Sequence, residues 1–289
     1  MLNNFNYPFP HIIHDNFFDE KLLAQVIKYW PDNNHFYDEI KGIRLFDLVN
    51  ATKDLPNEQK EFWNHFKEHH FPLINSQIYD CFKEKIIKKF STEDLPYPAQ
   101  FNLMQSTSGF KAHAPHGHHY HNPNWAYTML LYIESNHETT DGTDIYFPST
   151  IHNLETNDDF TEFAIKYIYG GSESFFEKPE YKECKIDLVK KVEYKSNRLF
   201  AFFESPLSYH GVSDSNNDDK NYQTSQRKII RLHASFPDNF IKSFYKYNKK
   251  EYEKLRRQYG EFTIDKKDYL KNIDSNIYEG IKREISILL

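Results

Sequence analysis

The sequence has few cysteines, no long apolar run and no excess of positive charge. Its two cysteines, Cys81 and Cys184, lie far apart and fit no metal or redox spacing, so we expect two reduced thiols in a cytoplasmic protein. No segment approaches the ~20 apolar residues that a membrane helix needs, and the first residues lack the pattern of a secretory signal. A net charge of −6 argues against nucleic-acid binding through bulk positive charge.

The chain has 289 residues, of which 39% are hydrophobic, and we predict one folded domain over residues 1–289. Aromatic residues reach 17%, which we interpret as a compositional background. Histidine is different, because five of the 15 histidines fall within residues 113–121. Compositional bias does not concentrate one residue type so locally, so this cluster is the first candidate for function.

Residues 1–98 are predicted to be mainly helical. Residues 19–30 have apolar side chains at helical spacing, with Asp19 as a possible N-cap and Pro31 as a stop. A longer helical stretch runs over 57–88, with a possible interruption near Phe71-Pro72. Residues 8–15 are expected to be extended.

Residues 99–236 are predicted to form antiparallel strands. Short runs rich in aromatic and β-branched residues, separated by Gly, Pro, Asn and Asp, occupy 100–104, 127–134, 143–147, 198–203 and 228–235. Residues 149–193 are predicted to be an insertion, and 214–226 a polar loop. Residues 237–289 return to a helical pattern, which indicates either a cover for the sheets or a homodimer contact. The sequence therefore predicts an α+β fold, a β-barrel or jelly roll with helical cover at both ends.

The histidine cluster contains an H-x-H pair, His119 and His121, which would share one face of a strand. Pro115 and Gly117 predict an irregular loop before it. Two imidazoles on one face can bind one metal ion, but a third ligand must come from a distant segment. His210, at the end of an apolar strand and turn, is the candidate.

A further strand carries Arg227, Arg231 and His233 at alternate positions, so they are expected to share a face. Arginines that point into a barrel are costly unless an anion pairs with them. This pattern predicts an anionic ligand inside the barrel.

Taken together, these segments resemble the Fe(II)/2-oxoglutarate-dependent dioxygenases, in particular the prolyl-hydroxylase-like branch. His119-Tyr120-His121-Asn122-Pro123-Asn124 stands where that family often has H-x-D-N-P-N. The other segments that carry the resemblance are 8–18, 129–133, 141–146, 197–212 and Arg227. Each motif is weak alone, but their order matches over residues 8–236. The resemblance implies a double-stranded β-helix, a cupin-like barrel, with Fe(II), 2-oxoglutarate and dioxygen as cofactor and co-substrates.

The resemblance also implies roles for particular residues. His119, His121 and His210 would bind Fe(II), and Arg227 would pair with the distal carboxylate of 2-oxoglutarate. Tyr132 could donate a hydrogen bond to the same carboxylate, and Arg231 could take over from Arg227 if the strand register differs. No catalytic residue beyond the metal centre is implied. The reaction would couple oxidative decarboxylation of 2-oxoglutarate to hydroxylation of a substrate.

One departure leaves alternatives open, because His121 replaces the carboxylate of the family pattern. The metal could instead use His116 or His113, or the site could be non-catalytic. Two further hypotheses are a cupin-like three-histidine enzyme independent of 2-oxoglutarate and a barrel that acts as a binding module. The first is disfavoured because the next glutamate, Glu134, is too far from the H-x-H pair. A small-molecule or peptidyl substrate is expected, with 149–193 and 214–226 at the mouth of the site.

Overall fold

The structure is a computed structural model that describes residues 2–38, 43–106, 113–116, 124–135, 142–148, 186–205, 207–212 and 227–237. At 113–116, Ser135 and Val212 it describes the backbone alone. These residues form a mixed α/β structure with two antiparallel sheets and a group of helices. None of the helices among them combines the length and the apolar character needed to span a membrane.

The larger sheet contains eight strands and holds most of the predicted ones. Its order is β1 (Asn4–Phe5), β2 (His11–His14), β10 (Arg198–Phe203), β7 (Trp125–Ser135), β12 (Arg227–Ser235), β5 (Tyr97–Ser106), β4 (Ile43–Asp47) and β3 (Tyr37–Asp38). Every described pairing in it is antiparallel. The predictions of strands at 100–104, 127–134, 198–203 and 228–235 are confirmed, as is the extended segment expected at 8–15, which contains β2.

The smaller sheet contains four strands in the order β6 (His113–His116), β11 (His210–Val212), β8 (Thr143–Phe147) and β9 (Asp187–Val192). The strand predicted at 143–147 is confirmed. Two predictions were wrong here. The loop expected before His119 contains β6, which pairs with β11 despite Pro115, and the insertion predicted over 149–193 ends in an edge strand, β9.

The helices are α1 (Glu20–Lys28), α2 (Asn57–His65) and α3 (Phe71–Phe90), with short 3₁₀ segments at Asn33–His35 and Ala51–Asp54. The prediction that Asp19 caps α1 is confirmed, since its Oδ1 accepts a hydrogen bond from the Leu22 N–H at 2.7 Å. The interruption expected near Phe71-Pro72 is a π-helical turn, η3 (Phe66–His70). This turn is consistent with Pro72, which lacks the N–H of a regular helical bond.

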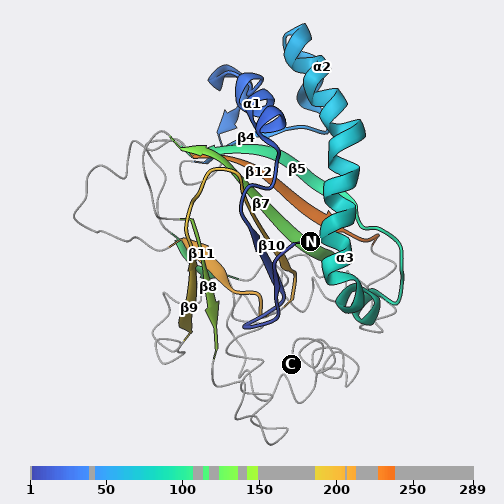
Figure 1. Ribbon diagram of the computed structural model, residues 1–289, viewed down its shortest axis with the longest axis vertical. Coiled ribbons are helices and arrows are strands. Elements are labelled where there is room, and N and C mark those ends of the chain that lie inside the picture. Colours follow the sequence, from blue (N-terminus) through green and yellow to red (C-terminus); the bar gives the residue numbers. More distant parts are fainter. Residues whose placement is uncertain are drawn as a thin grey trace, which may run out of the picture.

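Helix α3 packs on the outer face of the larger sheet (Figure 1). The Tyr127 hydroxyl of β7 donates to Asn75 Oδ1 at 2.6 Å, and the rings of Tyr127 and Phe82 are 5.9 Å apart. Near the end of α3, the buried Lys89 Nζ donates to the carbonyl oxygens of Glu204 at 2.8 Å and Trp125 at 3.3 Å. These contacts attach the helix to β7 and to the end of β10.

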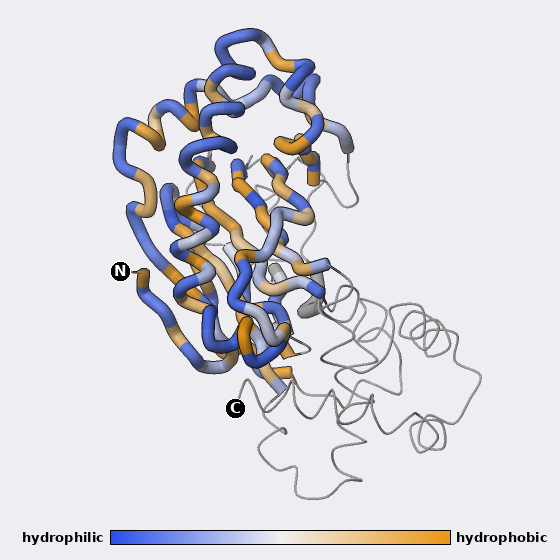
Figure 2. The backbone as a smooth tube through the Cα atoms, turned by 90° about the vertical axis from the view of Figure 1, so that its right-hand side faces the viewer, coloured by the Kyte–Doolittle hydropathy of each residue, from blue (hydrophilic) through white to orange (hydrophobic). Residues whose placement is uncertain are grey.

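The inner face of the larger sheet packs against the smaller sheet. The Tyr132 hydroxyl of β7 and the Thr143 hydroxyl of β8 are 2.7 Å apart, and the rings of Phe202 and His210 are 4.5 Å apart. Hydrophobic and hydrophilic positions alternate along the described chain, as one-sided burial of strands and helices requires (Figure 2). The space between the sheets is therefore the place where buried polar side chains of both sheets can meet.

Tyr127→Phe tests the attachment of α3. The variant should lower the free energy of unfolding by about 1–3 kcal/mol, because the buried Asn75 Oδ1 loses its donor. Tyr97→Phe makes the same chemical change at an exposed position, 47% accessible, and should cost less than about 0.5 kcal/mol. Urea unfolding measures both, and equal midpoints would contradict this account of the helix–sheet contact.

Candidate functional site

His210 is the predicted metal ligand that the structure describes in full. It is the first residue of β11, is buried, and lies with its ring against Phe202. Its Nδ1 is 3.0 Å from the Ser208 carbonyl oxygen. A carbonyl oxygen only accepts, so Nδ1 carries a proton, and in the neutral imidazole the lone pair is then on Nε2. Metal-binding histidines typically have such a hydrogen bond on the ring nitrogen that does not bind the metal, and it fixes the tautomer and the orientation of the ring.

A second histidine backbone lies directly opposite His210. In the β6–β11 pairing His116 is the partner of His210, and His113 is the partner of Val212. The register thus brings the alternative ligand His116 to the same level of the smaller sheet. His119 and His121 lie outside the described residues, and within those residues no three metal-ligating side chains form a group. The H-x-H assignment stays a prediction.

Arg227 and Tyr132 lie together at the other end of β7 and β12. Arg227 is opposite Ser135 and is 5% exposed, and its backbone N–H donates to Ser106 Oγ at 3.0 Å. Tyr132 is 1% exposed. Burial raises the pKa of Tyr132 to about 12, while the hydrogen bond with Thr143 and then the charge of Arg227 act in the opposite direction. A guanidinium beside a neutral phenol is a combination that suits a carboxylate ligand.

Two residues that the sequence analysis missed complete this polar end. The Thr143 hydroxyl hydrogen-bonds with Tyr132, and the Tyr194 ring stacks on Tyr132 at 4.6 Å. Burial also raises the pKa of Tyr194, against the charge of Arg227. Gly142, directly before β8, allows the chain to pass close to the end of β9, since a Cβ at Gly142 would lie 2.0 Å from the Val192 carbonyl oxygen. The sequence signal that could have indicated Thr143 is the glycine directly before it, at the start of a predicted strand.

Arg231 lies further along β12. It is half-buried, opposite Asn102 on β5 and Leu130 on β7. With the Asn102 amide oxygen turned toward it, that oxygen accepts a hydrogen bond from the guanidinium at 3.3 Å. Residues 228–233 run opposite 105–100 without a register shift, so Arg231 and His233 share a face as predicted.

A buried acid–hydroxyl–imidazole chain joins the end of β10 to β7 and β12, and the sequence analysis did not single it out. The Thr128 hydroxyl contacts Glu204 Oε1 and lies 2.6 Å from His233 Nδ1. Burial raises the pKa of the fully buried Glu204 to about 7, against the effects of Thr128 and Lys89, and burial lowers the pKa of His233. The Thr128 hydroxyl donates its single hydrogen to Glu204 Oε1, so His233 Nδ1–H is the donor to Thr128 Oγ1.

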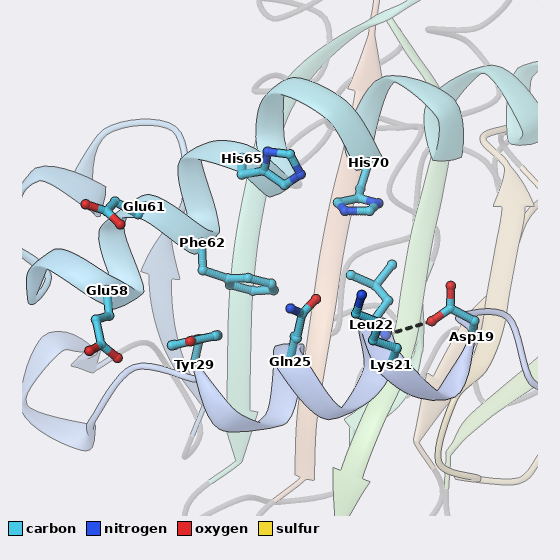
Figure 3. A pocket seen from close by; sticks show the side chains of 10 residues that line it. All are labelled: Asp19, Lys21, Leu22, Gln25, Tyr29, Glu58, Glu61, Phe62, His65 and His70. Carbon is cyan, nitrogen blue, oxygen red and sulfur yellow. Dashed lines mark hydrogen bonds between the residues drawn. The ribbon is translucent and has the colours of Figure 1, made fainter.

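A separate hollow of about 550 Å³ lies between α1, α2 and η3 (Figure 3). Its wall includes the stacked rings of Tyr29 and Phe62, 5.0 Å apart, with His65 and His70 at one end. Burial, followed by the neighbouring His65, lowers the pKa of His70. This hollow is built from helices and shares no residue with the space between the sheets.

Comparison with known proteins finds likeness in structure alone. No protein-family model matches the sequence, and no curated protein matches it. The chain is similar to a 2OG-Fe(II) oxygenase family oxidoreductase from Burkholderia pseudomallei, with 9% identity, a TM-score of 0.43, and coverage of 78% of this chain and 84% of that one.

Two prolyl hydroxylases are also similar. The enzyme from Trichoplax adhaerens, in complex with a hypoxia inducible factor peptide fragment, has 10% identity and a TM-score of 0.42, over 78% of this chain and 83% of that one. The Pseudomonas putida prolyl-4-hydroxylase has 9% identity and a TM-score of 0.40, over 78% and 93%. At these values the likeness assigns neither a reaction nor a substrate to this chain.

Glu204→Gln tests the buried acid. A folded-state pKa of about 7, above the ordinary value near 4.3, means that the wild type loses stability as pH rises between these values. Relative to the variant, the wild-type free energy of unfolding should fall by about 3 kcal/mol from pH 4 to pH 8. Urea unfolding across this range measures the difference, with Glu84→Gln, an exposed glutamate of α3, as control. A pH-independent difference would show that Glu204 titrates normally.

Proposed function

We propose that the protein is a non-haem Fe(II) oxygenase that couples oxidative decarboxylation of 2-oxoglutarate to hydroxylation of a substrate. The observation that carries the proposal is that buried Tyr132 bonds to Thr143 of the smaller sheet, while buried His210 packs on Phe202 of the larger sheet. Both therefore lie between the sheets, and the charge of the buried Arg227 acts on Tyr132. A carboxylate-binding end and an imidazole with its lone pair on Nε2 are what a metal with a dicarboxylate co-substrate requires.

The proposed barrel is a double-stranded β-helix. Its support is the strand order, in which β10-β7-β12-β5 of the larger sheet accompany β6-β11-β8-β9 of the smaller sheet. From β5 to β8 each successive strand changes sheet, and so does each from β9 to β12. A single domain over 1–289 and C-terminal helices that cover the barrel stay predictions, because residues 238–289 lie outside the described chain.

His210 is proposed to bind Fe(II) through Nε2, together with His119 and His121. The alternative second ligand is His116, which the β6–β11 register sets opposite His210. Imidazole donors fit Fe(II), and three of them in place of two with a carboxylate leave the site one unit more positive. When bound, the iron would supply the activation of dioxygen.

The chain's own contribution is binding, orientation and exclusion of water. Arg227 is proposed to pair bidentately with the distal carboxylate of 2-oxoglutarate, with Tyr132 as a second donor. Arg231, half-buried on the same face of β12, is proposed to lie on the substrate side. The buried rings of Phe200 and Phe202 would keep water from the reacting groups.

The substrate is proposed to be a small molecule or a peptide, a choice that rests on the resemblance described for the sequence. The segments expected to select it are 149–193 and 214–226, of which 149–185 and all of 214–226 lie outside the described residues. A homodimer through the C-terminal helices stays a prediction for the same reason. A 2-oxoglutarate-independent three-histidine enzyme is the less favoured function, because cupins usually have a glutamate a few residues after H-x-H, and the next one here, Glu134, is too far away.

Anaerobic addition of Fe(II) and 2-oxoglutarate should produce a weak metal-to-ligand charge-transfer band in the visible spectrum. His210→Ala should abolish the band, whereas His69→Ala, at an exposed helical histidine, should retain it. His121→Ala and His116→Ala compare the two ligand sets, since the variant that loses the band identifies the ligand. A wild type with neither the band nor succinate formation would refute the proposed function.

Arg227→Ala should raise the concentration of 2-oxoglutarate that half-saturates this band. The loss of a charge-assisted pair costs about 1.5–3 kcal/mol, which corresponds to roughly ten- to hundredfold in affinity. Arg227→Lys keeps the charge but not the bidentate geometry, so its half-saturating concentration should lie between those of the wild type and Arg227→Ala. Titration of the band measures all variants, with Arg231→Ala as the matched comparison. An unchanged value for Arg227→Ala with a large change for Arg231→Ala would transfer the role to Arg231.

A further inference from the structure

The segment that connects β10 to His210 is a closed hydrogen-bonded turn. We call it the serine turn, residues 203–209, of which Pro206 lies outside the described chain. Ser205 and Ser208 are both 0% exposed, although serine is mostly found at protein surfaces. Two fully buried hydroxyls next to a candidate metal ligand require an account of what they do.

The hydrogen atoms of this turn have only one consistent arrangement. The Ser208 hydroxyl donates to the Phe203 carbonyl oxygen at 2.6 Å, which uses its single hydrogen. The hydroxyls of Ser205 and Ser208 are 2.7 Å apart, so Ser205 is the donor in that bond. Ser205 Oγ in turn accepts from the Leu207 N–H at 3.2 Å. The chain runs in one direction, from the Leu207 amide to the Phe203 carbonyl.

The backbone closes the same turn. The Ser208 N–H donates to the Ser205 carbonyl oxygen at 3.2 Å, and the Tyr209 N–H donates to the Leu207 carbonyl oxygen at 2.8 Å. The Ser208 carbonyl is left to accept from His210 Nδ1 at 3.0 Å. Side-chain and backbone bonds therefore fix the one peptide group that orients the imidazole.

Both ends of the turn are attached to other elements. At its start the Phe203 N–H donates to the Pro10 carbonyl oxygen at 3.0 Å, and the following Glu204 N–H donates to the Ala126 carbonyl oxygen at 2.9 Å. At its end the Tyr209 carbonyl accepts from the Tyr146 N–H at 3.0 Å. The turn cannot rotate as a unit without breaking contacts to β7 and β8.

We propose that Ser205 and Ser208 are positioning residues for His210: they aim the Ser208 carbonyl at Nδ1 and thereby hold Nε2 toward a divalent transition metal. This inference rests on the proposed function for the identity of the metal site. It goes beyond that function by assigning the geometry of the site to two hydroxyls that do not touch the metal. Loss of such an outer hydrogen bond typically lowers metal affinity ten- to a hundredfold.

The test uses Co(II), whose visible absorption reports coordination geometry. Ser208→Ala and Ser205→Ala leave the Ser208 carbonyl in place but free it to move, so each should weaken Co(II) binding by up to about tenfold and alter the absorption spectrum of the complex. Ser235→Ala is the matched control, because Ser235 is also 0% exposed and its hydroxyl donates to the Asn124 carbonyl oxygen at 3.1 Å. The Ser235→Ala variant should be less stable than the wild type but should keep the wild-type Co(II) affinity and absorption spectrum.

A second readout needs no metal. In the metal-free protein, ¹⁵N chemical shifts should show His210 as the single Nδ1–H tautomer in the wild type and as a mixture in Ser208→Ala. If Ser208→Ala loses as much stability as Ser235→Ala but retains both the Co(II) spectrum and the single tautomer, the positioning role is overturned. If Ser208→Ala does not fold, Ser205→Ala, which keeps the Ser208–Phe203 bond, gives the same comparison.

The outcomes separate this inference from the proposed function. Undiminished Co(II) binding by His210→Ala would refute the metal site, while the tautomer measurement would still test the serine turn. If His210→Ala abolishes Co(II) binding but Ser205→Ala and Ser208→Ala leave the affinity and the spectrum unchanged, the metal site is supported and the positioning role is refuted.

Discussion

The constraint on which the structure depends is that polar groups buried between the two sheets must be hydrogen-bonded. Strand alternation sends every second side chain of β7, β10 and β12 into that space, and several of these are polar or charged. A partner is favoured because an unsatisfied buried polar group costs about 1–3 kcal/mol, although some buried atoms, Glu204 Oε2 among them, have no hydrogen bond among the described residues. The Tyr132–Thr143 bond, the Thr128–His233 bond and the serine turn are the solutions that the described residues show. The candidate site is built from the same hydrogen bonds that offset the cost of burying these polar groups.

The interior has two ends with different chemistry. Around Arg227 and Tyr132 a positive charge and a phenol favour an anion. Around Thr128 lie the imidazole of His233, whose pKa is lowered by burial, and Glu204, an acid whose pKa is raised by burial. The proposed co-substrate has a carboxylate at one end and a metal-chelating group at the other, so its orientation would follow from this division. The positive end would attract the distal carboxylate, and the chelating end would then lie toward His210.

Local patterns allowed much of the fold to be predicted. Asp19 as a cap, the helices around η3 and the five longer strands depend on side chains a few residues apart. Pairing between distant strands could not be predicted in this way. β6 looked like a loop because Pro115 dominates its local signal, and β9 looked like part of an insertion because its lysines hide the alternation of an edge strand. In the site, parity identified the face shared by Arg231 and His233, whereas Tyr194 and Glu204 gained their neighbours only through tertiary contacts. The roles of His119 and His121 stay predictions.

The position of β2 has a consequence for the order of events during synthesis. β2 forms a ladder with β10, and the Phe18 N–H donates to Asn197, 179 residues later in the chain. The apolar residues of this early strand therefore leave the ribosome long before their partner exists. Such a nascent segment must wait in a partly folded state, in which an unpaired strand is open to mispairing. A high contact order of this kind favours slow folding and gives a chaperone that shields short apolar strands a direct effect on yield.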